Sequence, residues 1–167
     1  SFFQTNPKCA EKLYQKVIDY TLENNNLEDS VVMDLFCGTG TIGQLLASQI
    51  KNVKVIGVDI VSSAIENAKK NAKLNGIDNL DFFAADVGKF LLEYPQYKGK
   101  IDTIILDPPR AGIIPKALKR VIELDAKRIV YVSCNPATQA RDSKELREAG
   151  YELVKFSLVD QFPHTAH

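Results

Sequence analysis

The sequence has few of the residues that build disulfide-stabilised or metal-dependent proteins. Among its 167 residues are three cysteines, two histidines and one methionine, and tryptophan is absent. The cysteines, Cys9, Cys37 and Cys134, stand singly, and no CxxC pair occurs. An odd, unpaired set suits a reducing compartment and offers no zinc-binding pattern. Because His164 and His167 are the only histidines, we expect no histidine-rich metal site and no bound metal.

The chain also lacks net charge and long apolar runs. Lys plus Arg and Asp plus Glu both number 21, so the formal net charge is zero. This balance argues against a protein whose main task is to coat nucleic acid, but it leaves room for an enzyme that acts on one. No apolar run is long enough to span a bilayer, and no signal-peptide pattern opens the sequence. We therefore expect a cytoplasmic protein without a membrane partner.

Apolar, β-branched runs alternate with amphipathic segments along the chain. Buried parallel strands read as short apolar runs, so the alternation predicts a mainly parallel sheet with helices on both faces. Strands are expected at residues 31–36, 53–58, 80–84, 101–106, 128–132 and 152–159. Ser63 and Glu66 form a capping-box pattern, which predicts a helix start. With no internal repeat and no linker, we expect one doubly wound α/β domain over residues 1–167.

A glycine pattern follows the first predicted strand. Gly38, Gly40 and Gly43 satisfy G-x-G-x-x-G between a strand and a helix, and Asp59 ends the next strand about 20 residues on. Glycine lets the backbone approach a ligand closely, and a carboxylate can accept the protons of both ribose hydroxyls. NAD-type dinucleotides and S-adenosylmethionine (SAM) share this logic, and the glycines do not decide between them.

The fourth predicted strand leads into Asp107-Pro-Pro-Arg-Ala-Gly112. Two consecutive prolines stiffen the backbone and remove two N–H groups. This shelf resembles the Asp/Asn-Pro-Pro motif of SAM-dependent methyltransferases that act on bases, so it favours SAM. Asp86, after the third strand, is placed either to contact adenine or to cap the following helix, and both interpretations stay open.

Cys134 falls between the predicted strand 128–132 and a helix that Pro136 would begin, with Asn135 as a candidate cap. A helix N-terminus lowers the pKa of a thiol and makes the nucleophilic thiolate accessible. A lone cysteine is more commonly a small buried apolar residue. This stretch alone leaves both interpretations open.

Motifs spread over the whole chain resemble those of the SAM-dependent RNA uracil-5-methyltransferases. The matching stretches are Ser1-Phe-Phe-Gln-Thr-Asn6, Asp34-Leu-Phe-Cys-Gly38, Leu106-Asp-Pro-Pro-Arg-Ala-Gly112, Tyr131-Val-Ser-Cys-Asn-Pro-Ala-Thr138 with Ala140-Arg-Asp142, and Phe162-Pro-His-Thr-Ala-His167. The resemblance implies a Rossmann-like class I methyltransferase fold and methyl transfer from SAM to C5 of a uridine. The expected partner is tRNA or ribosomal RNA, and we expect a monomer.

The same resemblance assigns roles to single residues. Cys134 would be the catalytic nucleophile that adds to C6 of uracil, whereas Cys9 and Cys37 read as packing residues. The residues implied to contact SAM are Gln4, Phe36, Gly38, Asp59, Asp86 and Asp107. The resemblance further implies that the general-base glutamate and the last strand of the family lie beyond His167, and that an RNA-binding module precedes Ser1.

Two other functions remain open on sequence alone. One is SAM-dependent methylation of an exocyclic amine of a base, which the double-proline shelf permits and which would not need Cys134. The other is an NAD-dependent oxidoreductase that uses the same glycine turn. Arg110 and Phe162 are candidates to hold a flipped nucleotide, although surface or packing duty explains them equally well. Local positive charge, which a solvated helix face also explains, comes from Lys116, Lys119, Arg120, Lys127 and Arg128.

Overall fold

The computed structural model describes residues 7–23, 25–133, 136–151 and 153–157. Within them lies one sheet, whose strands are β1 (Val31–Leu35), β2 (Lys54–Asp59), β3 (Leu80–Ala84), β4 (Thr103–Leu106), β5 (Arg128–Ser133) and β6 (Leu153–Ser157). The strand order is β3-β2-β1-β4-β5-β6, and every neighbouring pair is parallel. The predicted mainly parallel sheet is confirmed, with β6 paired directly to β5.

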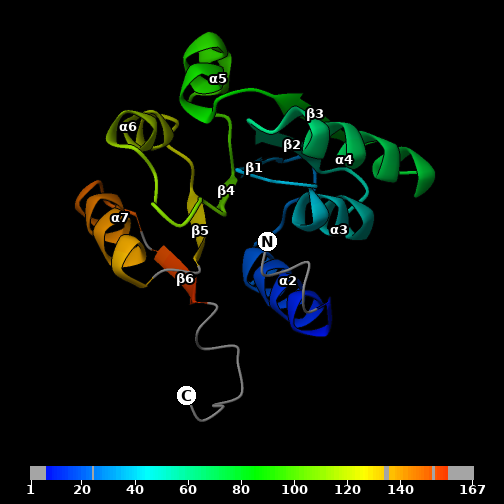
Figure 1. Ribbon diagram of the computed structural model, residues 1–167, viewed down its shortest axis with the longest axis horizontal. Coiled ribbons are helices and arrows are strands. Elements are labelled where there is room, and N and C mark those ends of the chain that lie inside the picture. Colours follow the sequence, from blue (N-terminus) through cyan, green and yellow to red (C-terminus); the bar gives the residue numbers. More distant parts are fainter. Residues whose placement is uncertain (1–6, 24, 134–135, 152, 158–167) are drawn as a thin grey trace.

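Helices cover both faces of this sheet (Figure 1). They are α2 (Pro7–Leu22), α3 (Thr41–Gln49), α4 (Ser62–Leu74), α5 (Val87–Glu93), α6 (Pro115–Glu123) and α7 (Pro136–Glu148), with a short 3-10 helix η1 (Pro95–Tyr97) after α5. The first three pack on one face, and α5, α6 and α7 pack on the other. The doubly wound architecture follows from this arrangement.

Each central strand contributes apolar side chains to two separate cores. In β1, Val32 faces α2, α3 and α4, whereas Met33 and Leu35 face α5, α6 and α7. In β4, Ile105 faces α2, α3 and α4, and Ile104 faces α5, α6 and α7. All five are fully buried, and burying such a side chain stabilises a fold by about 1.5–3 kcal/mol. The two cores explain why these strands are apolar at consecutive positions rather than alternating.

The strand order reverses between β1 and β4. From β1 the chain proceeds to β2 and β3 on one side, and from β4 to β5 and β6 on the other. In sheets of this kind, ligands bind outside the carboxyl ends of the strands at the reversal. The backbone N–H of Asp107 donates to the carbonyl of Leu35 across this point, at 3.3 Å. The segments that follow β1 and β4 are therefore held side by side.

Helix α4 begins differently from its predicted start. It starts at Ser62, its cap position is Val61, and no side chain caps it, so the capping-box prediction at Ser63 is wrong. The reason is the carboxylate of Asp59, whose Oδ1 accepts the N–H of Val61 at 2.9 Å. This bond turns the chain into the helix ahead of Ser63. None of the described helices is long and apolar enough to cross a membrane.

Arg128, the first residue of β5, ties the N-terminal helix α2 to the amino end of that strand. Its Nη1 donates to the carbonyl oxygens of Tyr20 at 2.7 Å and of Glu23 at 2.9 Å. A cation at a helix C-terminus satisfies carbonyls that have no partner within the helix. Arg128 therefore anchors α2 to β5.

Candidate functional site

The turn after β1 has an unusual backbone. Phe36, Gly38 and Gly40 all have positive φ angles, of 61°, 57° and 76°. A positive φ is uncommon for a residue with a side chain, and such strained residues cluster at functional sites. Gly40 is required by space as well, because a Cβ there would overlap the ring of Phe82. The turn brings bare backbone to the carboxyl edge of the sheet, as the glycine pattern predicts.

Asp59 ends β2 beside this turn. Its Oδ2 accepts the N–H of Gly38 at 2.9 Å, and its Oδ1 accepts the N–H of Val61 at 2.9 Å. A carboxylate has about four acceptor positions, so these two bonds leave acceptor capacity for ribose hydroxyls. Ile60 and Val61 follow directly and are 68% and 50% exposed. A polar acceptor thus lies beside a small apolar surface, which suits a nucleoside.

Asp86 caps α5. Its Oδ1 accepts the N–H of Lys89 at 3.0 Å, which is the bond expected of an N-cap carboxylate. The capping interpretation is therefore confirmed. The adenine contact implied by the resemblance stays a prediction.

Three carboxyl groups gather where the strand order reverses. Asp34, the residue before the last in β1, is 1% exposed, and its Oδ2 accepts the N–H of Gly43 at 3.2 Å. Burial raises the pKa of Asp34 to about 8, and the charges of Asp107 and Asp59 add to this effect. Burial and the charge of Asp59 raise the pKa of Asp107 to about 7. Because desolvation and like charges disfavour ionisation here, a cation bound beside the cluster would favour the ionised carboxylates and lower these pKa values.

Tyr14 of α2 belongs to the same region and was missed by sequence reasoning. Burial raises its pKa, and the charges of Asp107 and Asp34 raise it further, so the phenol lies within electrostatic range of both. Tyr14 sits on the apolar stripe of α2 with Leu13, Val17 and Ile18, and nothing in that pattern distinguishes it from a core residue. Asp34 could have been found, because a carboxylate inside an apolar strand is exceptional.

Some of the predicted site residues lie together in the described part of the chain, and others lie outside it. Phe36, Gly38, Asp59 and Asp107 lie together at the ends of β1, β2 and β4. The proposed nucleophile Cys134 and the proposed SAM contact Gln4 lie outside the described residues, as does Phe162. Their roles stay predictions.

Cys37 behaves as a packing residue, as expected. Burial, followed by the charges of Asp34 and Asp59, raises the pKa of its thiol far above the ordinary range. Its Sγ lies 3.7 Å from the carbonyl oxygen of Gly38. Cys37 is partly buried and packs against the core on the face that α2, α3 and α4 cover. A thiol held neutral in this way is a poor nucleophile.

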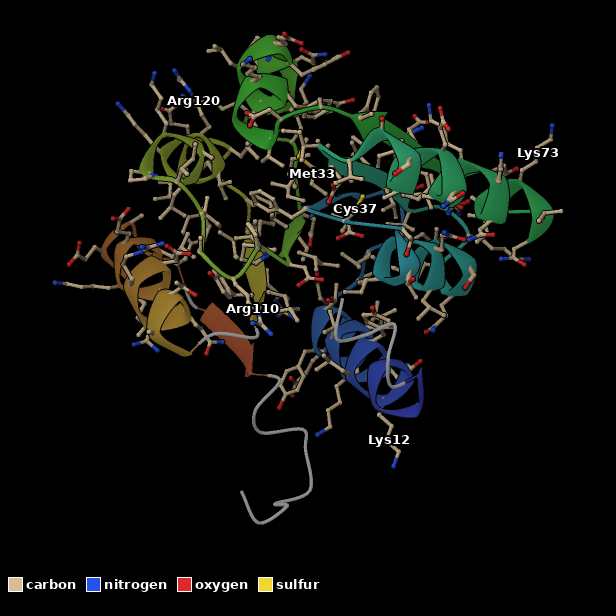
Figure 2. The ribbon with its side chains drawn as sticks, in the orientation of Figure 1. Lys12, Met33, Cys37, Lys73, Arg110 and Arg120 are labelled. Atoms are coloured by element: carbon tan, nitrogen blue, oxygen red, sulfur yellow. The ribbon has the colours of Figure 1, made fainter. Side chains whose placement is uncertain are left out.

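Basic side chains of the described residues lie on several different helices. Figure 2 shows Lys12, Lys73 and Arg120 projecting outward from three different helices. Arg120 forms an ion pair with Glu123 at 3.0 Å, and Arg128 begins β5 at the edge opposite the carboxyl ends. Arg110 is exposed in the loop after the two prolines, at the site itself.

The parallel sheet, its glycine turn and the acid at the end of β2 define a Rossmann-like α/β domain, a fold in which ligands bind at the strand reversal. The chain belongs to the tRNA (uracil-5-)-methyltransferase family, whose family model matches residues 1–167. An uncharacterized RNA methyltransferase of Clostridium acetobutylicum is 51% identical to it over 167 residues, and one of Clostridium tetani is 50% identical. These alignments cover 100% of this chain and 35% of each relative, so the chain spans about a third of their length.

Solved structures support the fold. TrmN from Thermus thermophilus has a TM-score of 0.63 at 22% identity, over 81% of this chain and 43% of that one. A SAM-dependent methyltransferase from Aquifex aeolicus has a TM-score of 0.63 at 16% identity, over 80% of this chain and 78% of that one. The predicted Rossmann-like methyltransferase fold is confirmed.

Proposed function

We propose that this domain transfers a methyl group from SAM to C5 of a uridine in tRNA or ribosomal RNA, through covalent addition of the Cys134 thiolate to C6 of the base. The observation that carries the proposal is the family match over residues 1–167, read together with the strand order. The glycine turn follows β1, and the Asp107 loop follows the neighbouring β4. In the chain, Cys134 comes directly after Ser133, the last residue of the next strand, β5.

The described residues fit SAM. Asp59 is the candidate acceptor for the ribose hydroxyls, and the exposed pair Ile60 and Val61 offers an apolar surface for the adenine. The backbone at Gly38, where an added Cβ would meet nothing within 4 Å, permits close approach of the ligand. Asp34 has a buried Oδ1 without a hydrogen-bond partner among the described residues, and Asp107 lies nearby. SAM is a cation at its sulfonium, so its binding would favour the ionised forms of these two carboxyls.

The reaction needs a nucleophile because C5 of uracil is a poor one. The Cys134 thiolate would add to C6, and the C5–C6 π electrons would move towards C5 and O4 as an enolate. SAM, when bound, would supply the methyl group: the electron pair at C5 would form the new C–C bond, and the electrons of the broken S–CH3 bond would stay on the sulfur, which becomes a neutral thioether. A base then removes the C5 proton, and the returning electrons re-form the C5–C6 double bond and release the thiolate. Such covalent catalysis divides one difficult step into several easier ones.

The target uracil must also leave the stack of bases in the RNA to reach the thiol. Flipping a nucleotide costs a few kcal/mol. The exposed guanidinium of Arg110 is a candidate to hold the flipped nucleotide, through a phosphate or a base edge. Asp107 follows β4 in the same loop, and the rigid Pro108 and Pro109 separate the two residues.

The test is covalent trapping by RNA that carries 5-fluorouridine. Fluorine at C5 cannot leave as a proton does, so the protein with SAM should form an adduct with the RNA that survives denaturing electrophoresis. Cys134→Ser should form none while it binds SAM in calorimetry with unchanged affinity. Cys37→Ser is the matched control and should still trap, because that thiol is packed against the core and its pKa is raised.

Three results would contradict the proposal. If Cys134→Ser still trapped the RNA, Cys134 would not be the nucleophile. Methylation of an exocyclic amine, found by mass spectrometry of the RNA product and unaffected by Cys134→Ser, would favour the alternative methyltransferase reaction. Binding of NAD in preference to SAM would favour an oxidoreductase.

A further inference from the structure

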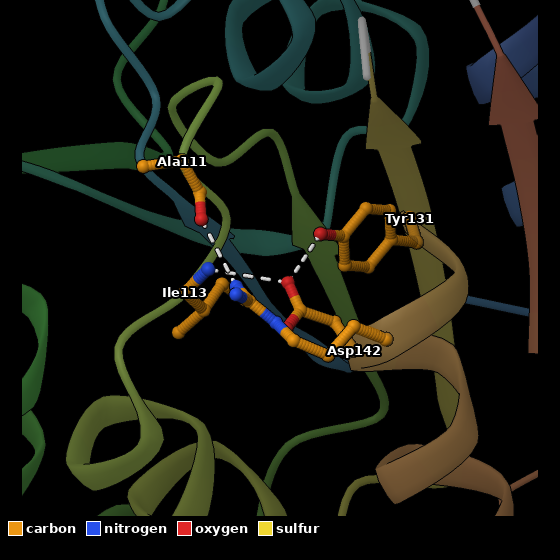
Figure 3. A network of polar contacts seen from close by, with 5 residues as sticks. Ala111, Ile113, Tyr131 and Asp142 are labelled. Atoms are coloured by element: carbon orange, nitrogen blue, oxygen red, sulfur yellow. Dashed lines mark hydrogen bonds and ion pairs between the residues drawn. The ribbon is translucent and has the colours of Figure 1, made fainter. Parts of the chain in front are cut away.

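A buried carboxylate lies beside the site without a role in the proposed reaction. Asp142, on α7, is 1% exposed. Its Oδ2 accepts two hydrogen bonds, from the hydroxyl of Tyr131 at 2.6 Å and from the backbone N–H of Ile113 at 3.1 Å (Figure 3). A buried charge is costly unless it is paired and hydrogen-bonded. Its presence therefore calls for a reason beyond packing.

Arg141, the preceding residue, completes this network. Its Nη2 donates to the carbonyl of Ala111 at 2.9 Å, and its Nε lies 3.4 Å from Oδ1 of Asp142. Gly112 lies between the two partners, because a Cβ there would overlap Nη2 of Arg141 and lie 3.1 Å from Oδ2 of Asp142. Two side chains of α7 therefore hydrogen-bond to Ala111 and Ile113 and pack closely against Gly112, in the loop that follows Asp107.

The network joins three elements around the proposed chemistry. Tyr131 belongs to β5, Asp142 to α7, and residues 111–113 to the loop between β4 and α6. In the chain, β5 ends at Ser133 and α7 begins at Pro136, so these two elements flank Cys134. The loop carries Asp107 and the two prolines at its start. The Asp142 carboxylate thus connects α7, the element after the proposed nucleophile, to β5, the element before it, and to the loop that begins beside the glycine turn.

We propose that Asp142, assisted by Arg141, is a positioning residue: it fixes residues 111–113 of the loop between β4 and α6 against β5 and α7, and so sets the approach of the reacting groups. The inference rests on the proposed function. Reacting atoms must be held within a few tenths of an ångström, and a misplacement of about 1 Å costs on the order of 100-fold in rate. A buried carboxylate with fixed donors can hold such a geometry, because its bonds have short lengths and defined directions.

The experiment measures the rate of adduct formation with 5-fluorouridine RNA at saturating SAM, the dissociation constant for SAM, and the melting temperature. Asp142→Asn replaces one acceptor oxygen with an amide NH2, and Tyr131→Phe removes one donor only. Asn79→Ala is the control, because Asn79 donates to three backbone carbonyls, of Ala47, Ile50 and Val53, at the opposite edge of the sheet. Rates are compared at equal intervals below the melting temperature of each variant.

Asp142→Asn should lose about 10- to 100-fold in trapping rate with SAM affinity within about threefold of the wild type, and Tyr131→Phe should lose less. Asn79→Ala should keep the wild-type rate. If Asp142→Asn does not fold, Tyr131→Phe and Arg141→Ala must still lose rate relative to Asn79→Ala. Equal rates for these variants and the control would overturn the inference alone. A wild type that never traps would overturn the proposed function, and this inference with it.

Discussion

Replacing Asp34 with asparagine is expected to change how the stability of the protein depends on pH. Asp34 is buried in β1, where burial and the charges of Asp107 and Asp59 raise its pKa from 3.8 to about 8. In the unfolded chain the group returns to its ordinary value. Between about pH 4 and pH 8 the folded protein therefore holds a proton at Asp34 that the unfolded chain does not.

The sign and size follow from this difference. A raised pKa in the folded state contributes stability that is fully present at low pH and is lost as the pH rises towards 8. One such proton changes the free energy of unfolding by about 1.4 kcal/mol per pH unit, or roughly 3 kcal/mol between pH 5.5 and 7.5. Asp107, whose pKa is raised to about 7, adds a loss of the same sign over the lower part of this range.

The asparagine of the Asp34→Asn variant would be a neutral mimic of the protonated acid. Its carbonyl oxygen can accept the N–H of Gly43, as Oδ2 of Asp34 does at 3.2 Å. Between pH 5.5 and 7.5, the free energy of unfolding of the variant should therefore fall by about 3 kcal/mol less than that of the wild type. Urea denaturation followed by far-ultraviolet circular dichroism, at constant ionic strength, measures both slopes. Asp81→Asn is the control, because Asp81 is an exposed partner of Lys54 and should keep the wild-type slope.

Parallel curves for the wild type and Asp34→Asn would refute this reasoning. They would mean that Asp34 is ionised in the folded protein and that its charge is compensated. The raised pKa of Asp34, and the pH dependence of stability derived from it, would then be wrong.

Two further predictions concern local structure. Gly40→Ala should lower the free energy of unfolding by about 1–3 kcal/mol more than Gly99→Ala, because both glycines have φ of 76° but only a Cβ at position 40 meets Phe82. Equal losses in urea denaturation would show that the Phe82 ring moves aside freely. Arg128→Ala should cost about 1–2 kcal/mol, since it leaves the last carbonyls of α2 unpaired, whereas Arg120→Ala should change stability by less than about 1 kcal/mol. Thermal unfolding measures the stability of both arginine variants, and equal shifts in their melting temperatures would contradict the anchoring role of Arg128.

The sequence predicts the elements well because each central strand is apolar on both sides. All six predicted strands overlap the observed ones, and Pro115 begins a helix as expected. The glycine turn and Asp59 were predictable because their partners lie close in sequence and follow a fixed spacing. The capping box failed because a tertiary partner, the Asp59 carboxylate, bonds the chain before Ser63.

The long-range partners could not be predicted in this way. Arg141 and Asp142 stand in a motif that the family resemblance singles out, but their contacts to Ala111 and Ile113 appear only when α7 packs on the loop after β4. Arg128 was grouped with the basic helix residues, although its guanidinium binds the end of α2. Each of these side chains acts across a distance in sequence that local patterns do not report.

The anchor between Arg128 and α2 has a consequence for the order of folding. Its hydrogen bonds join residues that are up to 108 positions apart, so α2 gains this partner only after the chain has been made as far as β5. Contacts of such high sequence separation slow the search for the native state. Native-state hydrogen exchange should therefore find the last turn of α2 opening together with β5, as one cooperative unit, and independent fraying of that turn would argue against the coupling.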